Sequence, residues 1–373
     1  MTSTPKSTPR ETLLAAIGRR PAGGFCFSTY NCHPFAWGPH AAEPGYRPIL
    51  EAIDRAAAAC LCKVSATRRG GLEPRVSQSR EGSTLVTTAK LATPRGELIR
   101  VTRTPPGQPS MCVRHFVQDD ADVERYLSLG RDAKSVSWDV AELLRRAREI
   151  GERGLPYLDY TDPFYEVSEL FDQEDFIIRC ATEAGVIEEL VRASHERVLG
   201  ELRSLLAALK GSGQRFLFYT AGPERATPPL LPPAAFERFV VPYQRELVAL
   251  IHSAGHPVSL HCHGRIRKVL DAALECGYDV IEPLEPPPQG DIGLEELLGS
   301  VGDRAALLGY MQDQDLHRLD PEEIRDRVRR IRLTVGARPG FVCAPTCTPF
   351  QFPPSPRYVA SYVAFLEEAA AAR

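Results

Sequence analysis

The chain of 373 residues lacks the features that would place it in a specialised class of protein. Nothing in it approaches the roughly 18 consecutive apolar residues of a membrane-spanning helix. The first 20 residues have no apolar core followed by a small-residue cleavage site, so they do not read as a secretory signal. Positive and negative charges nearly balance, with 45 Lys and Arg and 48 Asp and Glu. We therefore expect a globular cytoplasmic protein that binds neither nucleic acid nor a membrane.

Cysteine is too sparse for a disulfide scaffold, with ten in the whole chain. Without a signal peptide, these cysteines are expected to be thiols or metal ligands in a reducing compartment. A glycine-rich phosphate fingerprint is also missing after every early strand, which argues against a doubly wound nucleotide-binding sheet.

Short apolar runs alternate with amphipathic segments along the chain, and five such units lie in the second half. Their strands are RFLFYTAG, HPVSL, YDVIEP, AALLGYM and GFVCAPTC. Repeated strand–helix units indicate a parallel sheet. A doubly wound sheet is one solution, and a closed (β/α)8 TIM barrel of the α/β class fits better.

The domain organisation follows from changes in composition. Residues 1–20 read as a tail and a short helix, and residues 21–373 as the barrel. A stretch at about 63–116 changes character, with two β-branched runs around the turn Thr93-Pro94-Arg95-Gly96. It predicts a β-hairpin inserted ahead of the main barrel.

Two early segments carry residues of interest. The loop 33–48 is rich in aromatics, Pro and Gly, so His33 and Trp37 either line a pocket or pack a lid. Residues 49–62 are predicted to be a helix that ends in Cys60 and Cys62. Further on, FIIRC at 176–180 reads as a strand.

The stretch HPVSLHCHG at 256–264 ends an apolar run with two histidines. If the strand runs to residue 263, His261 and His263 share one face and Cys262 points the other way, because side chains two apart in a strand lie on the same side. The pair is either half of a metal site or two hydrogen-bonded histidines at a strand-to-helix turn.

Other polar residues follow the ends of neighbouring strands, where barrel enzymes place their active sites. They are Glu224, Glu282, Gln312, Asp313, Cys343 and Cys347. Imidazole, thiolate and carboxylate are zinc ligands, and an open position would make the site catalytic. Cys347, in a loop flanked by Pro345 and Pro349, is the preferred thiolate, with Cys343 in reserve. The alternative is that the histidines bond to each other and the cysteines pack.

Long strings resemble the uroporphyrinogen decarboxylase superfamily, whose members are (β/α)8 barrels. They include GPERATPPLLPPAAFERFVVPY, HCHGRIRKVLDAALECGYDVIEPLEPPPQGDI and CAPTCTPF. One branch decarboxylates uroporphyrinogen without metal and carries a basic MRQAGRYLP-type segment near the N-terminus. Here FCFSTYNCHPFAWGPH stands in its place, with no Arg.

The other branch contains zinc-dependent methyltransferases, which pass a methyl group between a corrinoid protein and a thiol. Their His-x-Cys-Gly and APGC motifs are similar to His261-Cys262-His263-Gly264 and to Ala344-Pro345-Thr346-Cys347. His261 and Cys347 match by position, whereas His263 stands where that branch has a cysteine. Coenzyme M as the substrate therefore does not follow.

The resemblance implies zinc-dependent methyl (alkyl) transfer to a thiol, with Zn²⁺ on His261, His263 and Cys347. Glu282 would be a fourth ligand or would orient a histidine. Glu224 and Gln312 would act beside it, and Tyr219, His33 and Trp37 would contact the substrate. The expected partners are a small-molecule thiol and a separate corrinoid protein, and a homodimer is compatible with the sequence.

Two alternatives remain open at this point. A metal-free decarboxylase of a polycarboxylated substrate would need Arg225, Arg265 or Arg267 at the barrel mouth. A non-catalytic binding protein would keep the barrel and leave the strand-end histidines and cysteines without a pocket.

Overall fold

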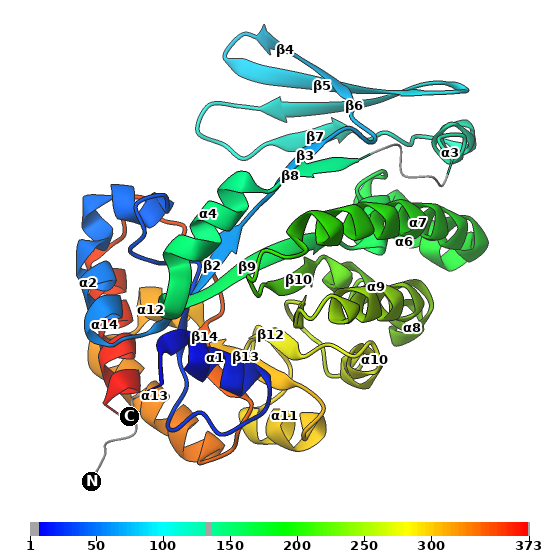
Figure 1. Ribbon diagram of the computed structural model, residues 1–373. Coiled ribbons are helices and arrows are strands. Elements are labelled where there is room, and N and C mark those ends of the chain that lie inside the picture. The colour runs from blue at the N-terminus through cyan, green and yellow to red at the C-terminus, as the bar shows by residue number, and fades with distance from the viewer. Residues whose placement is uncertain (1–6, 131–135, 372–373) are drawn as a thin grey trace.

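Eight parallel strands form a nearly closed barrel in the computed structural model, which describes residues 7–130 and 136–371 (Figure 1). The strands follow one another in the order β1-β2-β9-β10-β11-β12-β13-β14. A bridge between Phe27 and Cys343 brings the first strand to the last. The predicted TIM-barrel class is confirmed. The strands are Ser28–Tyr30, Ala59–Val64, Gly154–Thr161, Leu217–Ala221, Val258–His261, Val280–Leu284, Ala306–Met311 and Phe341–Pro345.

Alternation along each strand separates two hydrophobic layers. On β14, Val342 and Ala344 belong to the cluster inside the barrel, whereas Phe341 and Cys343 belong to the layer between strands and helices. Helix α1 (Pro9–Ile17) packs Leu13 into the inner cluster from the end where the strands begin. The inner hydrophobic cluster therefore fills the base of the barrel, and polar side chains lie at its mouth.

The remaining helices surround the barrel strands, except α3, which lies beside the inserted sheet. They are α2 Arg47–Arg55, α3 Asp120–Leu127, α4 Ala141–Ile150, α5 Pro163–Ser168, α6 Gln173–Thr182, α7 Ala184–Leu209, α8 Pro233–Phe239, α9 Val241–Ser253, α10 Leu270–Glu275, α11 Leu294–Val301, α12 Asp313–Arg318, α13 Pro321–Val335 and α14 Pro356–Ala370. Within the described ranges, no helix is long and apolar enough to cross a membrane.

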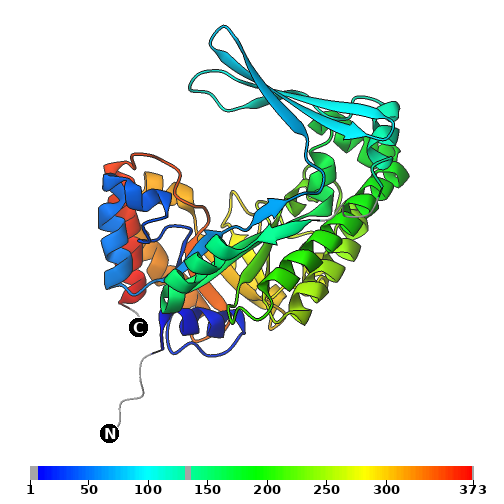
Figure 2. The ribbon, with the colours of Figure 1, turned by 45° about the horizontal axis from the view of Figure 1, so that its top comes forward.

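The insertion is larger than the predicted hairpin. The hairpin itself is present, since β5 (Thr84–Thr93) and β6 (Gly96–Thr104) pair through Thr93 and Gly96. Strands β4 (Arg75–Glu81) and β7 (Met111–Arg114) extend it to four antiparallel strands. A small ladder of β3 (Thr67–Arg69) with β8 (Ser137–Asp139) connects it to the barrel. Figure 2 shows this sheet projecting beyond the rest of the molecule.

Two predicted elements were wrong. The predicted helix 49–62 stops at Arg55, and the chain turns at Ala57, whose φ is 47°, before Ala59–Val64 joins the barrel as β2. Pairing with β1 and β9 overrides the helical propensity of the alanine run there. The predicted strand 176–180 lies in helix α6, which buries Phe176 and Cys180 one turn apart and exposes Ile178. Residues 1–6 of the predicted tail lie outside the described residues.

Candidate functional site

His261 and His263 lie at the end of the barrel where the strands finish. His261 is the last residue of β11, and its neighbour in the ladder with β12 is Glu282. Cys262 is buried in the outer hydrophobic layer, as the strand alternation predicted. The Nε2 atoms of the two histidines are 3.1 Å apart.

Each histidine has its own carboxylate on the opposite ring nitrogen. His261 Nδ1 lies 2.9 Å from Glu282 Oε2. His263 Nδ1 lies 3.3 Å from Glu285 Oε2. A carboxylate acceptor holds the proton on Nδ1, so each neutral ring presents an unprotonated Nε2.

Two such nitrogens facing each other at 3.1 Å would repel through their lone pairs. The arrangement is satisfied either by a proton shared between them or by a cation bound to both. A tetrahedral zinc ion with bonds of about 2.0–2.1 Å separates two nitrogen ligands by about 3.3 Å. Histidine ligands of zinc are commonly oriented by carboxylates on the other nitrogen. The pair therefore fits half of a zinc site.

Glu282 is held by more than the histidine. Its side chain is 1% exposed. Tyr157 donates to Oε1, and the Ser259 hydroxyl lies 3.3 Å from the same oxygen. Tyr30 completes the group, with its hydroxyl 3.0 Å from His261 Nδ1. Since both carboxylate oxygens are engaged, Glu282 acts here as the group that orients His261.

The titration behaviour of these groups follows from their surroundings. Burial works to lower the pKa of His261, but the Glu282 charge and hydrogen bond outweigh it, so the pKa is raised. For Glu285, burial acts to raise the pKa, yet its bonds from His263 and the Gly264 amide bring it below the ordinary value. Burial and the Glu282 charge raise the pKa of Tyr157 well above its usual range, so this hydroxyl stays a donor.

The other predicted mouth residues surround this network. Tyr219 stacks on Tyr157 with ring centroids 3.8 Å apart. Glu224 accepts the Gly222 amide at 3.0 Å, and its charge acts on His261. Gln312 is 2% exposed, and its Nε2 donates to Gln314 Oε1.

The two candidate cysteines differ. Cys343 is fully buried in the layer between strands and helices, so its side chain faces away from the barrel interior. Cys347 lies in the loop after β14 and is partly exposed, with its thiol 3.4 Å from the Thr348 carbonyl. Burial raises the pKa of Cys347, with smaller contributions from Asp313 and Glu285. Of the two, Cys347 is the one near the mouth carboxylates.

His33 and Trp37 belong to a separate aromatic cluster with Phe35. The rings of His33 and Trp37 are 4.3 Å apart, and Arg146 lies over the Trp37 ring. Burial lowers the pKa of His33 to about 4. Their predicted contact with substrate stays a prediction.

Sequence reasoning missed Tyr30, Tyr157 and Glu285, although all three contact the site. Glu285 lies three residues after Glu282 and directly follows the end of β12. That position after a strand was a signal in the sequence that it could belong to the site. Tyr30 and Tyr157 come from strands far away in the chain. Across residues 7–130 and 136–371, no three His, Cys, Asp or Glu side chains are arranged to hold a metal ion. The two histidines thus lie together without a third ligating side chain beside them among these residues.

Part of the chain matches a known family, and the whole chain is similar in structure to solved proteins. Residues 206–359 match the family model for uroporphyrinogen decarboxylase (URO-D). No curated protein matches the chain. A methyltransferase from Methanosarcina mazei has a similar structure, with a TM-score of 0.59, 12% identity, and 97% of this chain and 98% of that chain covered. At this identity, the likeness shows a shared fold.

Two further solved structures are less similar. A B12-independent methionine synthase from Shewanella sp. W3-18-1 gives a TM-score of 0.42 and 14% identity, over 90% of this chain and 87% of that one. The YdhT protein from Bacillus subtilis gives 0.38 and 9%, over 91% and 88%. The segment matched by the family model contains both histidines, Glu282 and Cys347, so residues 206–359, which hold the candidate site, are URO-D-like.

Proposed function

We propose that this chain transfers a methyl (alkyl) group to a thiol substrate at a zinc site formed by His261, His263 and Cys347. The observation that carries the proposal is the histidine pair, with Nε2 atoms 3.1 Å apart and a carboxylate on each Nδ1. A bound zinc ion would keep a thiol deprotonated at neutral pH and so supply a nucleophile that is otherwise scarce.

The chain's own residues would fix the histidines and shape the pocket. Glu282 and Glu285 hold the two rings in the tautomer that leaves Nε2 available. Glu224 and Gln312 would act on the substrate from the neighbouring strand ends, and Tyr219 would line the pocket beside His261. The ring centroids of Tyr219 and His261 are 6.0 Å apart.

Cys347 is the remaining ligand in this proposal. Its loop follows β14, the strand whose end lies next to the barrel mouth, and its thiol bonds only a backbone carbonyl among the described residues. Replacing that weak contact costs little. The two neutral imidazoles would make the site less anionic than one with two thiolates, and a stronger Lewis acid.

The partners follow from the same proposal. The acceptor is a small thiol, and the methyl donor is a separate corrinoid protein, as in the methyltransferases that the sequence resembles. All ten cysteines are free thiols in the structure, which supports a reducing compartment such as the cytoplasm.

Metal analysis of the purified protein is the direct test. We expect about one zinc ion per chain, and its loss in a His261→Ala/His263→Ala variant. His252→Gln is the matched control, because His252 lies on α9 and bonds Asp279 away from the mouth. Methyl transfer from methylcobalamin to a panel of thiols should follow the metal content. Folded, active and zinc-free protein would refute the proposal.

The decarboxylase alternative has less support. Arg225 pairs with Glu169 at 2.6 Å, and Arg267 bonds Glu296 and Asp291 on the surface. The charges with the largest effect on the pKa of His261 are the carboxylates Glu282 and Glu224, with Lys63 acting in the opposite direction. Arg265 is exposed and has no ion pair among the described residues. Release of CO2 from uroporphyrinogen would reinstate this alternative.

A further inference from the structure

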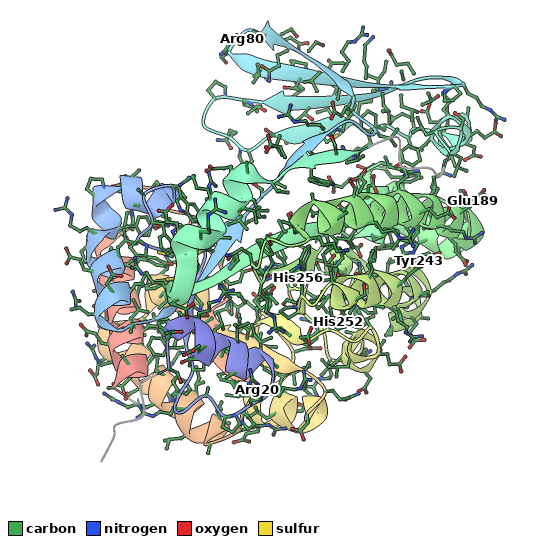
Figure 3. The ribbon with its side chains drawn as sticks, in the orientation of Figure 1. Arg20, Arg80, Glu189, Tyr243, His252 and His256 are labelled. Carbon is green, nitrogen blue, oxygen red and sulfur yellow. The ribbon has the colours of Figure 1, made fainter. Side chains whose placement is uncertain are left out.

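Strand β4 forms an outer edge of the inserted sheet. It pairs with β5 on one side, and no strand of the described residues pairs with its other side. All seven of its residues are exposed, and Val76 is exposed at 57%. Figure 3 shows Arg80 at the outer margin of the molecule, away from the barrel. Such an edge presents unpaired backbone groups to any strand that can dock there.

In the sequence of β4, Arg-Val-Ser-Gln-Ser-Arg-Glu, the oppositely charged Arg75 and Glu81 lie at equal distances from the central Gln78. An antiparallel pair of two copies with the two-fold axis at Gln78 brings residues at equal distances from Gln78 opposite each other. Arg75 then faces the partner's Glu81, and Ser77 faces the partner's Ser79. The two residues of each such pair are an even number of positions apart in the sequence. Since the direction of the backbone N–H and C=O groups alternates along a strand, both residues of a pair point these groups the same way, either towards the other copy or towards their own sheet.

The charges at the two ends of β4 favour this pairing. In its own sheet, Arg75 lies directly opposite Lys90, a like charge that destabilises the pair. Arg75 has no acidic partner among the described residues, while Lys90 is paired with Glu97. Glu81 contacts Arg103 and remains 57% exposed, so it has room for a second cation. By symmetry, the docked pair would gain the Arg75–Glu81 contact twice.

We propose that β4 pairs with β4 of a second copy, about a two-fold axis at Gln78, to join the two sheets into one of eight strands. Isologous contacts of this kind are the common route to a dimer. A strand from an unrelated protein would have to match this charge pattern, whereas a second copy does so by construction. Two seven-residue strands bury less than a standard interface, so the dimer is weak and depends on concentration.

Sedimentation velocity of the full chain over a range of concentrations tests the pairing. We expect dimer at the higher concentrations. Arg75→Glu turns two attractive contacts into repulsive ones and should weaken the dimer about tenfold or more. Glu81→Arg should do the same, and the Arg75→Glu/Glu81→Arg double variant should recover most of the affinity. Circular dichroism checks that each variant is folded.

Cross-linking tests the register. Gln78→Cys in a Cys112→Ser background places two thiols across the two-fold axis, within reach of a disulfide. Ser83→Cys, at the exposed β4–β5 turn, is the matched control and should not cross-link under the same mild oxidant. A chain that stays monomeric at its highest soluble concentration overturns the proposal. So does a dimer that Arg75→Glu leaves unchanged, or equal cross-linking through both cysteines.

Discussion

Replacing Tyr157 by Phe removes a single hydroxyl from the barrel interior and tests the network behind His261. That hydroxyl donates to Glu282, whose side chain is 1% exposed. Hydrogen bonds to charged groups contribute about 1.5–3 kcal/mol, and a buried acceptor that loses its donor bears the desolvation cost. We therefore expect the free energy of unfolding of metal-free protein to fall by about 1.5–3 kcal/mol.

The melting temperature should fall accordingly. The unfolding entropy is about 2.1 cal/mol/K per residue. For a chain of 373 residues, the expected loss of stability therefore lowers the melting temperature by roughly 2–4 °C. Glu282 also orients His261, so zinc affinity should fall by about 10–100-fold, as is typical for the loss of such supporting groups. Thermal unfolding by circular dichroism measures the first effect, and competition with a chelator measures the second.

Tyr219→Phe is the matched control. Tyr219 is 5% exposed and stacks on Tyr157, but its hydroxyl makes no hydrogen bond to the described residues. Its removal should leave zinc affinity unchanged and stability nearly so. Equal losses in the two variants would refute the reasoning. A Tyr157→Phe protein that is less stable but binds zinc normally would show that Glu282 positions nothing for the metal.

Three further predictions concern stability, each measured by urea unfolding. A Cβ on Gly154 would meet the Cys60 carbonyl oxygen at 1.9 Å, so Gly154→Ala should cost more than about 3 kcal/mol or prevent folding. Gly299 has open space around it in helix α11, so Gly299→Ala should stabilise by about 0.5–1 kcal/mol; a loss would contradict the local geometry. The Asp279 hydrogen bond raises the pKa of His252. The folded state therefore binds this proton more tightly than the unfolded state does. The resulting contribution to the free energy of unfolding is complete below about pH 6.5 and decreases as the pH rises above it. His252→Gln should cost about 0.5 kcal/mol at pH 5.5 and less at pH 8.5, because the pair is half-exposed; an equal cost at both would exclude the ion pair.

Much of the barrel was predictable because each strand carries a local signal. The five apolar runs of the second half gave β10 to β14, and the positions at or just after the ends of those runs gave Glu224, His261, Glu282 and Gln312. The two wrong elements are short segments whose composition suits both helix and strand. In both, burial by distant parts of the chain decided the outcome.

The residues that hydrogen-bond Glu282 and His261 were not predictable in the same way. Tyr157 meets Glu282 across the barrel, at a separation of 125 residues along the chain. Tyr30 reaches His261 from the first strand. No local sequence pattern indicates that either tyrosine belongs to the site. The role of each depends on which side chains of distant strands the closed barrel brings into contact.

The sequence alone predicted that His261 and His263 would share a face if the strand ran to residue 263. Strand β11 ends at His261, so the turn after it, and not strand alternation, places the His263 ring beside His261. The sequence also determined the barrel class, through the repeated strand–helix units. Only the tertiary structure decided that both rings turn their Nε2 atoms towards each other, that both oxygens of Glu282 are engaged by His261 and Tyr157, and that Cys343 points away from the barrel interior. These outcomes depend on the register between neighbouring strands and on barrel closure, which bring together side chains that no local pattern relates.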